Sequence, residues 1–309
     1  MTQSDHARSL HAETHLRSLR DFFRYAISRF EAAGLAYGHG TTNAVDEAAF
    51  MILESLHLPI DKLEPFLDAR LLPDERLALA QLIEARIATR KPAAYLLNKA
   101  YIKGIPFYVD ERVIVPRSFI GELLFEGLFG GGGEPLIDPD SVDSVLDLCT
   151  GSGALAILAA HLFPDAQVDA VELSADALAV ARRNAAQSPA ADRIELFQGD
   201  LFAPVKGRRY DLIITNPPYV DAQAMAALPA EYRHEPVMAL AGGEDGLDIV
   251  RRILRDAPEH LNPGGGLICE IGTGREILDA EFPSLSLLWL DTEESHAEVF
   301  WISAAGLMR

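Results

Sequence analysis

The chain has 309 residues, of which 49% are hydrophobic and 24% charged, a composition that predicts a globular protein of two domains with a sizeable core. Its formal net charge is −19, which disfavours a nucleic-acid binder, because such proteins usually present a basic face to phosphates. A basic protein partner is favoured instead, and an acidic surface that serves only solubility is the alternative.

Neither cysteine usage nor hydropathy places the chain outside the cytoplasm. The two cysteines, Cys149 and Cys269, form neither a disulfide framework nor metal-ligand spacing. The first thirty residues mix charged residues throughout, without an apolar core of signal-peptide length, and no stretch is long enough to span a membrane. We therefore expect a reduced, cytoplasmic protein without a metal and without a membrane association. The oligomeric state is not indicated.

The first ninety or so residues have the spacing of helices. Apolar residues from Leu16 to Phe30 recur at every third or fourth position, Asn43 is a candidate helix cap, and Pro73 is a candidate first helical residue. Residues 1–90 hold 13 acidic and 10 basic residues, whereas the remainder holds 33 and 17, so the acidity belongs mainly to the second part. We expect a helical domain over residues 1–92 and an α/β domain over residues 93–309.

The second part begins with a predicted hairpin, because short apolar runs flank Gly104 and Pro106. A glycine run at residues 130–133 predicts a loop. Apolar strands then alternate with helices, which is typical of a parallel sheet covered on both faces. The last two strands leave no room for a helix between them, which predicts a closing antiparallel hairpin. The strands are expected at residues 142–149, 168–171, 194–197, 212–215, 266–271, 286–290 and 299–303, and the helices at residues 154–163, 175–186 and 247–260.

A glycine-rich turn joins the first of these strands to its helix, with the sequence Asp147-Leu-Cys-Thr150-Gly151-Ser-Gly153. Its glycines allow a tight turn and the close approach of a ligand to the backbone in front of a helix N-terminus. The same stretch matches the dinucleotide fingerprint G-x-G-x-x-A, and a turn without any ligand is a further alternative.

Two further carboxylates follow neighbouring strands. Glu172 ends the second strand, where an acidic residue can hold ribose hydroxyls, and Asp200 follows the third strand. An NAD enzyme rarely needs an acid at the third position, whereas a methyltransferase commonly uses one to contact the adenine amine. Asp147 would then serve the ammonium group of a bound methionine moiety. We expect S-adenosylmethionine as the cofactor, bound by Asp147, Thr150, Gly151, Gly153, Glu172, Asp200 and Asn216.

The motif Asn216-Pro217-Pro218-Tyr219 follows the fourth strand. A planar amide or exocyclic nitrogen is a poor nucleophile because its lone pair is delocalised, so an enzyme must mainly orient it. The side-chain oxygen of Asn216 and the carbonyl of Pro217 can each accept one N–H of an acceptor NH₂ and so direct the lone pair towards a methyl group. The prolines stiffen the turn, and Tyr219 offers a flat wall. We expect Asn216, Pro217 and Tyr219 to be catalytic.

This chemistry leaves several functions open. Exocyclic amines of adenine or cytosine in nucleic acids and glutamine side chains in proteins are both planar NH₂ groups, so the motif does not separate them. An NAD-dependent oxidoreductase would explain the glycine fingerprint. A non-catalytic ribosome-assembly factor that retains a cofactor pocket is a third possibility.

These motifs, with Gly243-Glu-Asp-Gly-Leu247 downstream, resemble the protein glutamine N(5)-methyltransferases over nearly the whole chain. The resemblance implies a class I S-adenosylmethionine-dependent methyltransferase fold, with a Rossmann-like seven-stranded sheet. It also implies that the helical domain, residues 1–92, docks a protein substrate. In that family, the enzymes that modify release factors usually read Pro-Arg-Pro-Asp-Thr-Glu before the catalytic domain, whereas this chain reads Val115-Pro-Arg117-Ser118.

Other segments are similar to the branch of the family that modifies a ribosomal protein, among them the stretches around His39 and Tyr95 and the stretch Glu231-Tyr-Arg-His234-Glu-Pro236. The resemblance implies that the acceptor is a glutamine of large-subunit ribosomal protein three, a basic partner, with a release factor as the alternative. Phe119 stands where this branch often has a second proline. We expect His39 to be a turn or docking residue and His234 to lie near the acceptor loop.

Overall fold

The computed structural model describes residues 14–126, 136–292 and 295–308, so the expected loop at residues 130–133 lies outside the described residues. Two compact units make up the chain: the part up to Ala100 together with Leu228–His234, and Tyr101–Ala227 together with Glu235–Arg309. We call them the helical unit and the α/β unit. The helical unit extends past the expected boundary at residue 92 and includes the segment Leu228–His234, which the sequence did not indicate.

The helical unit is built around the apolar faces of its helices, as predicted. In its described part these are α2 (Leu19–Ala33), α3 (Ala44–Ser55), α4 (Pro73–Thr89) and α5 (Ala93–Leu97), with 3₁₀ turns at Glu64–Phe66 and Ala230–His234. The predicted cap is confirmed, since the Asn43 side chain accepts hydrogen bonds from two backbone N–H groups of α3. The predicted start of α4 at Pro73 is also confirmed. Phe22 and Phe30 of α2 are fully buried in the core of this unit.

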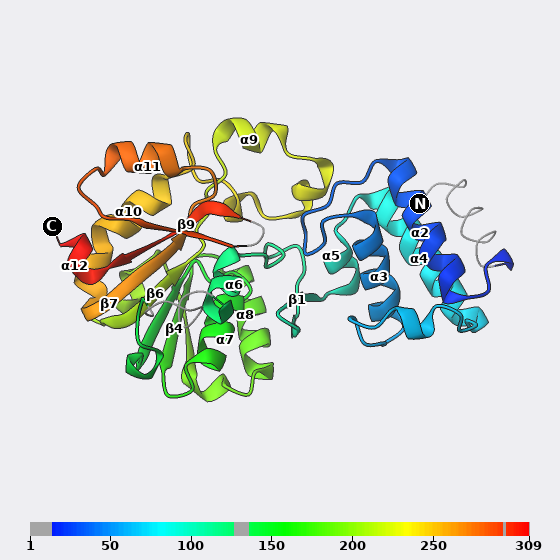
Figure 1. Cartoon of the computed structure of the whole chain (residues 1–309), viewed down its shortest axis with the longest axis horizontal. Helices are drawn as coiled ribbons and strands as arrows, with labels where there is room; N and C mark the ends of the chain where they lie inside the picture. The colour runs from blue at the N-terminus through cyan, green and yellow to red at the C-terminus, as the bar shows by residue number, and fades with distance from the viewer. Residues whose placement is uncertain (1–13, 127–135, 293–294, 309) are drawn as a thin grey trace. The chain divides into compact units, whose positions relative to one another are not determined.

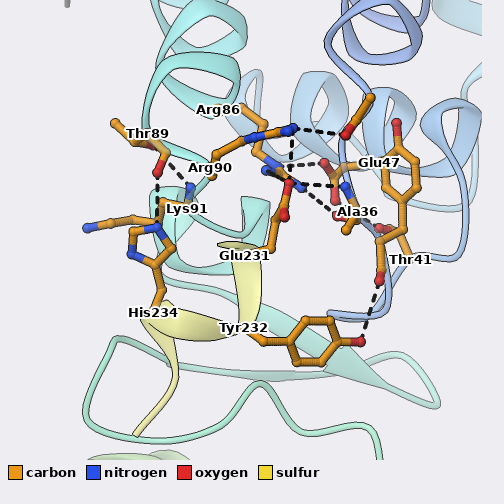
Figure 2. A network of polar contacts seen from close by, with 12 residues as sticks. Ala36, Thr41, Glu47, Arg86, Thr89, Arg90, Lys91, Glu231, Tyr232 and His234 are labelled. Carbon is orange, nitrogen blue, oxygen red and sulfur yellow. Dashed lines mark hydrogen bonds and ion pairs between the residues drawn. The ribbon is translucent and has the colours of Figure 1, made fainter. Parts of the chain in front are cut away.

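A buried ionic network holds the segment Leu228–His234 within the helical unit (Figure 2). Glu231 is 1% exposed and accepts a hydrogen bond of 3.0 Å from the backbone N–H of Ala36. Its carboxylate lies 3.2 Å from the guanidinium of Arg90 and 3.7 Å from that of Arg86. Arg86 in turn donates a 2.7 Å hydrogen bond to Glu47. Because an uncompensated buried charge costs several kcal/mol, these contacts fix the segment strongly.

The expected hairpin is confirmed at the start of the α/β unit. Strands β1 (Ala100–Ile102) and β2 (Ile105–Phe107) form a two-stranded sheet. Both residues of the connecting turn, Lys103 and Gly104, have positive φ angles, of 46° and 78°. Positive φ angles at both central residues are what a two-residue type I′ turn requires, and this turn has the twist that suits a β-hairpin.

The described residues of the α/β unit form the predicted seven-stranded sheet, in the order β5-β4-β3-β6-β7-β9-β8 (Figure 1). The first five strands in this order are parallel, and β9 runs antiparallel to both β7 and β8. The predicted closing hairpin is therefore confirmed. The strands are β3 (Ser144–Leu148), β4 (Gln167–Glu172), β5 (Ile194–Gln198), β6 (Tyr210–Thr215), β7 (Leu261–Glu270), β8 (Leu288–Asp291) and β9 (His296–Ser303).

Helices cover both faces of this sheet. Successive strand residues such as Val145 and Leu146 point to opposite faces, and each is buried in a different core. One core includes residues of α6 and α7, and the other includes residues of α10, α11 and α12 (Figure 1). The helices are α6 (Phe119–Glu126), α7 (Ala154–Leu162), α8 (Ala175–Gln187), α9 (Ala222–Ala227), α10 (Asp248–Asp256), α11 (Arg275–Glu281) and α12 (Ala304–Leu307).

Some boundaries differ from those expected. The helix expected at residues 247–260 ends at Asp256 and continues as a 3₁₀ turn, Ala257–His260, since Pro258 has no backbone N–H to continue the α-helical pattern. Helices α6, α9, α11 and α12 were not predicted from the sequence. Within the described residues, none of the helices combines the length and the apolarity needed to cross a bilayer.

The strand order fixes where a ligand can bind. The chain moves outward from β3 to β4 and β5 and then returns to the other side of β3 with β6. Ligands of open α/β sheets bind at such a reversal, beyond the carboxyl ends of the strands. The glycine-rich turn follows β3 and the Asn-Pro-Pro-Tyr motif follows β6, so both stand at this point.

Candidate active site

Asp147, near the end of β3, is completely buried and organises the glycine-rich turn. One of its carboxylate oxygens accepts a 2.5 Å hydrogen bond from the Thr150 hydroxyl and a 3.0 Å hydrogen bond from the backbone N–H of Ala156. The other oxygen, Oδ1, has no hydrogen-bond partner among the described residues. Burial raises the pKa of Asp147 to about 7.

The two glycines of this turn have different roles. Both have positive φ angles, 57° at Gly151 and 81° at Gly153. A Cβ atom at Gly153 would lie 3.3 Å from the Cβ of Ala181 in α8, so this glycine also allows α7 and α8 to pack closely. A Cβ atom at Gly151 would meet no atom closer than 4.0 Å. Gly151 therefore borders open space, whereas Gly153 borders protein.

Glu172, the last residue of β4, holds the turn from the neighbouring strand. Its carboxylate accepts hydrogen bonds from the backbone N–H groups of Gly151, at 2.9 Å, and Ser174, at 2.8 Å. Each of its oxygens therefore has one backbone donor and can accept further hydrogen bonds.

A cavity of about 330 Å³ lies within the α/β unit at the carboxyl ends of the strands. Its lining includes five of the residues expected at the site, namely Thr150, Gly151, Glu172, Asp200 and Asn216. Four others are not among the lining residues, namely Asp147, Gly153, Pro217 and Tyr219.

Asp200 follows β5 and has an arginine partner that the sequence analysis did not identify. The guanidinium of Arg252, on α10, donates a 2.7 Å hydrogen bond to the Asp200 carboxylate, and both residues line the cavity. Both side chains are partly exposed, so the pair alone contributes little to stability. No spacing in the sequence connects α10 with β5, and only the folded structure reveals this contact.

The acceptor loop, which we define as residues 216–219, begins at the end of β6. The hydroxyl of Thr215 donates a 3.0 Å hydrogen bond to the carbonyl of Leu148, which joins the ends of β6 and β3. Asn216 and Pro218 line the cavity, whereas Pro217 is buried. The Tyr219 hydroxyl donates a 2.8 Å hydrogen bond to Glu270 at the end of β7.

The glycine motif downstream has a packing role beside this loop. A Cβ atom at Gly242 would lie 2.7 Å from the Cα of Tyr219, and one at Gly246 would lie 2.3 Å from the Tyr219 carbonyl oxygen. Both distances are shorter than van der Waals contact allows. These positions therefore need glycine so that the backbone can lie against the acceptor loop.

A second loop borders the cavity at residues 115–119, and Pro116, Arg117 and Ser118 line it. Glu235, which is 3% exposed, accepts a 2.9 Å hydrogen bond from the Val115 backbone N–H. It also accepts two hydrogen bonds, of 2.6 and 2.8 Å, from the Arg117 guanidinium. Both segments appeared in the sequence analysis only as family signatures, and their pairing was not predicted.

The two histidines considered in the sequence belong to the helical unit. His39 is 4% exposed, and its ring lies 4.3 Å from the ring of Tyr232. His234 Nε2 lies 3.0 Å from the carbonyl oxygen of Thr89 (Figure 2). Neither lines the cavity. Among the described residues there is also no cluster of three or more potential ligands that could hold a metal ion.

Comparison with known proteins supports the fold. The family model described as "Methyltransferase small domain" matches residues 136–231. Among solved structures, the hMettl16 catalytic domain aligns with a TM-score of 0.51 and 16% identity, covering 72% of this chain and 82% of that chain. The class I methyltransferase fold expected from the sequence is thus confirmed.

Curated relatives match over almost their full length. The chain is 63% identical to "Ribosomal protein uL3 glutamine methyltransferase" of Bradyrhizobium diazoefficiens, covering 94% of this chain and 92% of the relative. It is 56% identical to the protein of the same name in Burkholderia pseudomallei, covering 95% and 97%. These names favour the methyltransferase interpretation over the oxidoreductase and the non-catalytic alternatives. The chain is therefore an S-adenosylmethionine-dependent methyltransferase that belongs to the ribosomal protein uL3 glutamine methyltransferase family.

Proposed function

We propose that this enzyme transfers a methyl group from S-adenosylmethionine to the side-chain amide nitrogen of a glutamine in ribosomal protein uL3. The observation that carries the proposal is that Asn216 lines the same cavity as Glu172 and Asp200. A group suited to orienting a planar NH₂ therefore borders the space suited to the cofactor. The names of the relatives supply the identity of the acceptor protein.

The residues around the cavity fit the cofactor. We propose that Glu172 holds the ribose hydroxyls, because this residue lines the cavity and its oxygens retain lone pairs beyond their backbone donors. Asp200 would accept a hydrogen bond from the adenine amine at its other carboxylate oxygen, the one to which Arg252 does not donate. Gly151 and Thr150 would let the backbone approach the ligand closely.

Asp147 and Gly153 would act on the cofactor through the turn that they shape. Asp147 holds the Thr150 hydroxyl and the start of α7, while its orphaned Oδ1 marks a buried acceptor near the cavity wall. Gly153 donates a 2.9 Å hydrogen bond from its backbone N–H to the Thr150 carbonyl. We propose that Asp147 shapes this turn and that its negative carboxylate also attracts the positive ammonium group of the methionine moiety.

The cofactor supplies a sulfonium-bound methyl group, which is a strong electrophile, so the protein's task is mainly orientation. We propose that the Asn216 side-chain oxygen and the Pro217 carbonyl each accept one N–H of the glutamine amide. This arrangement turns the nitrogen lone pair towards the methyl group and accommodates the developing positive charge. The methylated amide can then lose its extra proton to water, so no general base is required. Tyr219 would contribute by fixing the loop, since its hydroxyl is held by Glu270.

The acidic character of the α/β part suits a basic substrate. Residues 91–309 hold 33 acidic and 17 basic residues, which would attract a basic ribosomal protein over long range. We propose that the helical unit provides a docking surface for that protein. The substrate would then be recognised as a protein rather than as an isolated glutamine.

Methyl transfer to competing acceptors tests the proposal. The purified enzyme is incubated with methyl-labelled S-adenosylmethionine and with uL3, a release factor, a short glutamine peptide or DNA. We expect the label mainly in uL3, and we expect Asn216→Ala to abolish most of it. A preference for the release factor would keep the chemistry but refute the acceptor, and transfer mainly to DNA would overturn the function.

A further inference from the structure

Glu270, the last residue of β7, is a buried carboxyl group at the edge of the acceptor site. It is 1% exposed and accepts three hydrogen bonds. The Tyr219 hydroxyl donates to Oε1 at 2.8 Å, while the Ser118 hydroxyl and the Phe119 backbone N–H donate to Oε2 at 2.7 and 2.9 Å. One side chain thus joins the acceptor loop to the loop at residues 115–119.

The loop at residues 115–119 is held by carboxylates at both of its ends. Glu235 accepts hydrogen bonds from the Val115 backbone and the Arg117 guanidinium, whereas Glu270 accepts hydrogen bonds from Ser118 and Phe119. The middle of this loop lines the cavity. Of the two carboxylates, Glu270 also reaches the acceptor loop through Tyr219.

The ring of Tyr219 is closely confined, so its hydroxyl has a fixed direction. A Cβ atom at Gly272 would lie 2.7 Å from Cδ2 of the Tyr219 ring. Gly242 and Gly246 pack equally closely against the backbone of the same residue. A shift of the Tyr219 hydroxyl would therefore move the backbone of the acceptor loop with it.

The three donors explain why a carboxylate stands at this position. An ionised carboxylate only accepts hydrogen bonds, and its two oxygens can accept all three of these. Glutamine offers one acceptor oxygen, so with that oxygen towards Ser118 and Phe119 its NH₂ group would face Tyr219 and reverse the hydrogen bond, with the hydroxyl now accepting. Charge-assisted hydrogen bonds are also roughly twice as strong as neutral ones. Burial raises the pKa of Glu270, while its hydrogen bonds to Ser118, Tyr219 and Phe119 favour the charged form.

We propose that Glu270 is a positioning residue of the methyl transfer, which holds the acceptor loop through Tyr219 and the cavity wall through Ser118. This rests on the proposed function, in which Asn216 and the Pro217 carbonyl receive the glutamine amide. Transfer that depends on orientation is sensitive to small displacements, since a misplacement of about 1 Å can cost about a hundredfold in rate. Glu270 touches neither the acceptor nor the cofactor in this proposal and acts through its two partners.

The test compares kcat for methyl transfer to uL3 with the affinity for S-adenosylmethionine. We expect Glu270→Ala to lower kcat by about a hundredfold and Glu270→Gln by about tenfold, because the amide keeps the shape but loses the charge. The dissociation constant for the cofactor should change by less than about threefold, because Glu270 does not line the cavity. If Glu270→Ala does not fold, Glu270→Gln and Tyr219→Phe decide the matter.

A double-mutant cycle tests whether Glu270 acts through Tyr219. Tyr219→Phe should lower kcat in the wild-type background and have little further effect in the Glu270→Gln background, because the same hydrogen bond has already been weakened. Fully additive losses in this cycle would overturn the proposal. A kcat that stays within about threefold of wild type in both Glu270→Gln and Tyr219→Phe would also overturn it.

Tyr210→Phe is the matched control for Tyr219→Phe. Tyr210, the first residue of β6, donates a 2.6 Å hydrogen bond to Asp169, which is 8% exposed, and neither residue lines the cavity. This pair is also a hydrogen bond from a tyrosine to a buried carboxylate, which additionally binds Arg208, so the loss of the tyrosine hydroxyl should lower stability and leave kcat unchanged. If Asn216→Ala has a low kcat while the Glu270 variants have a normal kcat, only the positioning role of Glu270 is refuted. If Asn216→Ala itself has a normal kcat, the proposed acceptor site is refuted.

Discussion

The carboxylate of Glu172 accepts a hydrogen bond of 2.9 Å from the backbone N–H of Gly151, so the end of β4 holds the turn that follows β3. Two neighbouring strands therefore shape one edge of the cavity together. A side chain in this position supports the protein and can still accept hydrogen bonds from a ligand.

Glu172→Ala is expected to weaken the binding of S-adenosylmethionine about tenfold to a hundredfold, because a hydrogen bond to a charged group contributes roughly 1.5–3 kcal/mol. Isothermal titration calorimetry measures the effect. Glu195→Ala is a suitable control, because Glu195 lies on β5 and does not line the cavity. An unchanged affinity in Glu172→Ala would remove this residue from the cofactor site.

Asn216→Ala is expected to reduce turnover about a hundredfold or more, by analogy with the loss of other preorganised polar groups, and to affect cofactor affinity less. The control is Asn262→Ala, since Asn262 donates a 2.7 Å hydrogen bond to Asp211 and does not line the cavity. Single-turnover kinetics with uL3 separate the chemical step from substrate binding. A near-normal rate in Asn216→Ala would contradict the account of the acceptor loop.

Asp147→Asn is expected to stabilise the protein in a pH-dependent way. The pKa of Asp147 is about 7 in the folded protein, above the ordinary value of about 3.9, so the protonated form is favoured by folding. The contribution of protonated Asp147 to the free energy of unfolding is fully present below about pH 4 and is lost as the pH rises through about 7. Asparagine cannot ionise and can still accept hydrogen bonds from Thr150 and Ala156. Its advantage should therefore grow up to about pH 7 and then level off.

Urea denaturation measures this difference in the free energy of unfolding between the wild type and Asp147→Asn. The measurements are made at several pH values from about 5.5 to about 8.5, which spans the titration of Asp147. A difference that does not change with pH would contradict the pKa assigned to Asp147. In the same variant, the proposed role of the carboxylate predicts weaker binding of S-adenosylmethionine.

Glu231→Gln is expected to lower the free energy of unfolding by about 1–3 kcal/mol, because it weakens the buried contacts of Glu231 with Ala36, Arg86 and Arg90, while Arg86 keeps its pairing with Glu47. The control is Asp68→Asn, which removes the exposed ion pair between Asp68 and Arg20 and should have little effect. Hydrogen exchange provides an independent check, since Leu228–His234 should exchange faster in Glu231→Gln. Equal effects of the two substitutions would contradict the anchoring role of Glu231.

Association with uL3 is expected to slow as the salt concentration rises, because exposed charges are screened beyond about 8–10 Å near physiological ionic strength. A short glutamine peptide lacks both the docking surface and most of the charge, so its methylation should be slow and depend little on salt. Stopped-flow association and initial rates at low and high salt measure the two effects. Equal rates on peptide and protein would refute docking by the helical unit.

Local patterns in the sequence were sufficient to predict the seven strands of the large sheet in chain order, together with α7, α8 and α10. The alternation of apolar strands and helices places Glu172, Asp200 and Asn216 at the ends of strands, and these side chains do line one cavity. The cap at Asn43 and the first helical residue, Pro73, are equally local signals. Patterns of this kind depend on neighbours within a few residues and are therefore legible in a single sequence.

Contacts between distant residues could not be predicted in this way. Glu270 and Ser118 are 152 residues apart, and Glu235 and Arg117 are 118 apart, so no spacing rule connects them. The sequence also gave no reason to place Leu228–His234 with the helical unit, which follows from the partners of Glu231. Likewise, the depth at which Asp147 is buried depends on the packing of both sheet faces.

The most direct test of the central claim is the mass of uL3 in cells. Ribosomal proteins are compared, by intact mass and by peptide fragmentation, from a strain that lacks this enzyme and from the same strain complemented with the wild type or with Asn216→Ala. The account predicts one methylated glutamine in uL3 only where the wild-type enzyme is present. A uL3 mass that is the same in all three strains would contradict it.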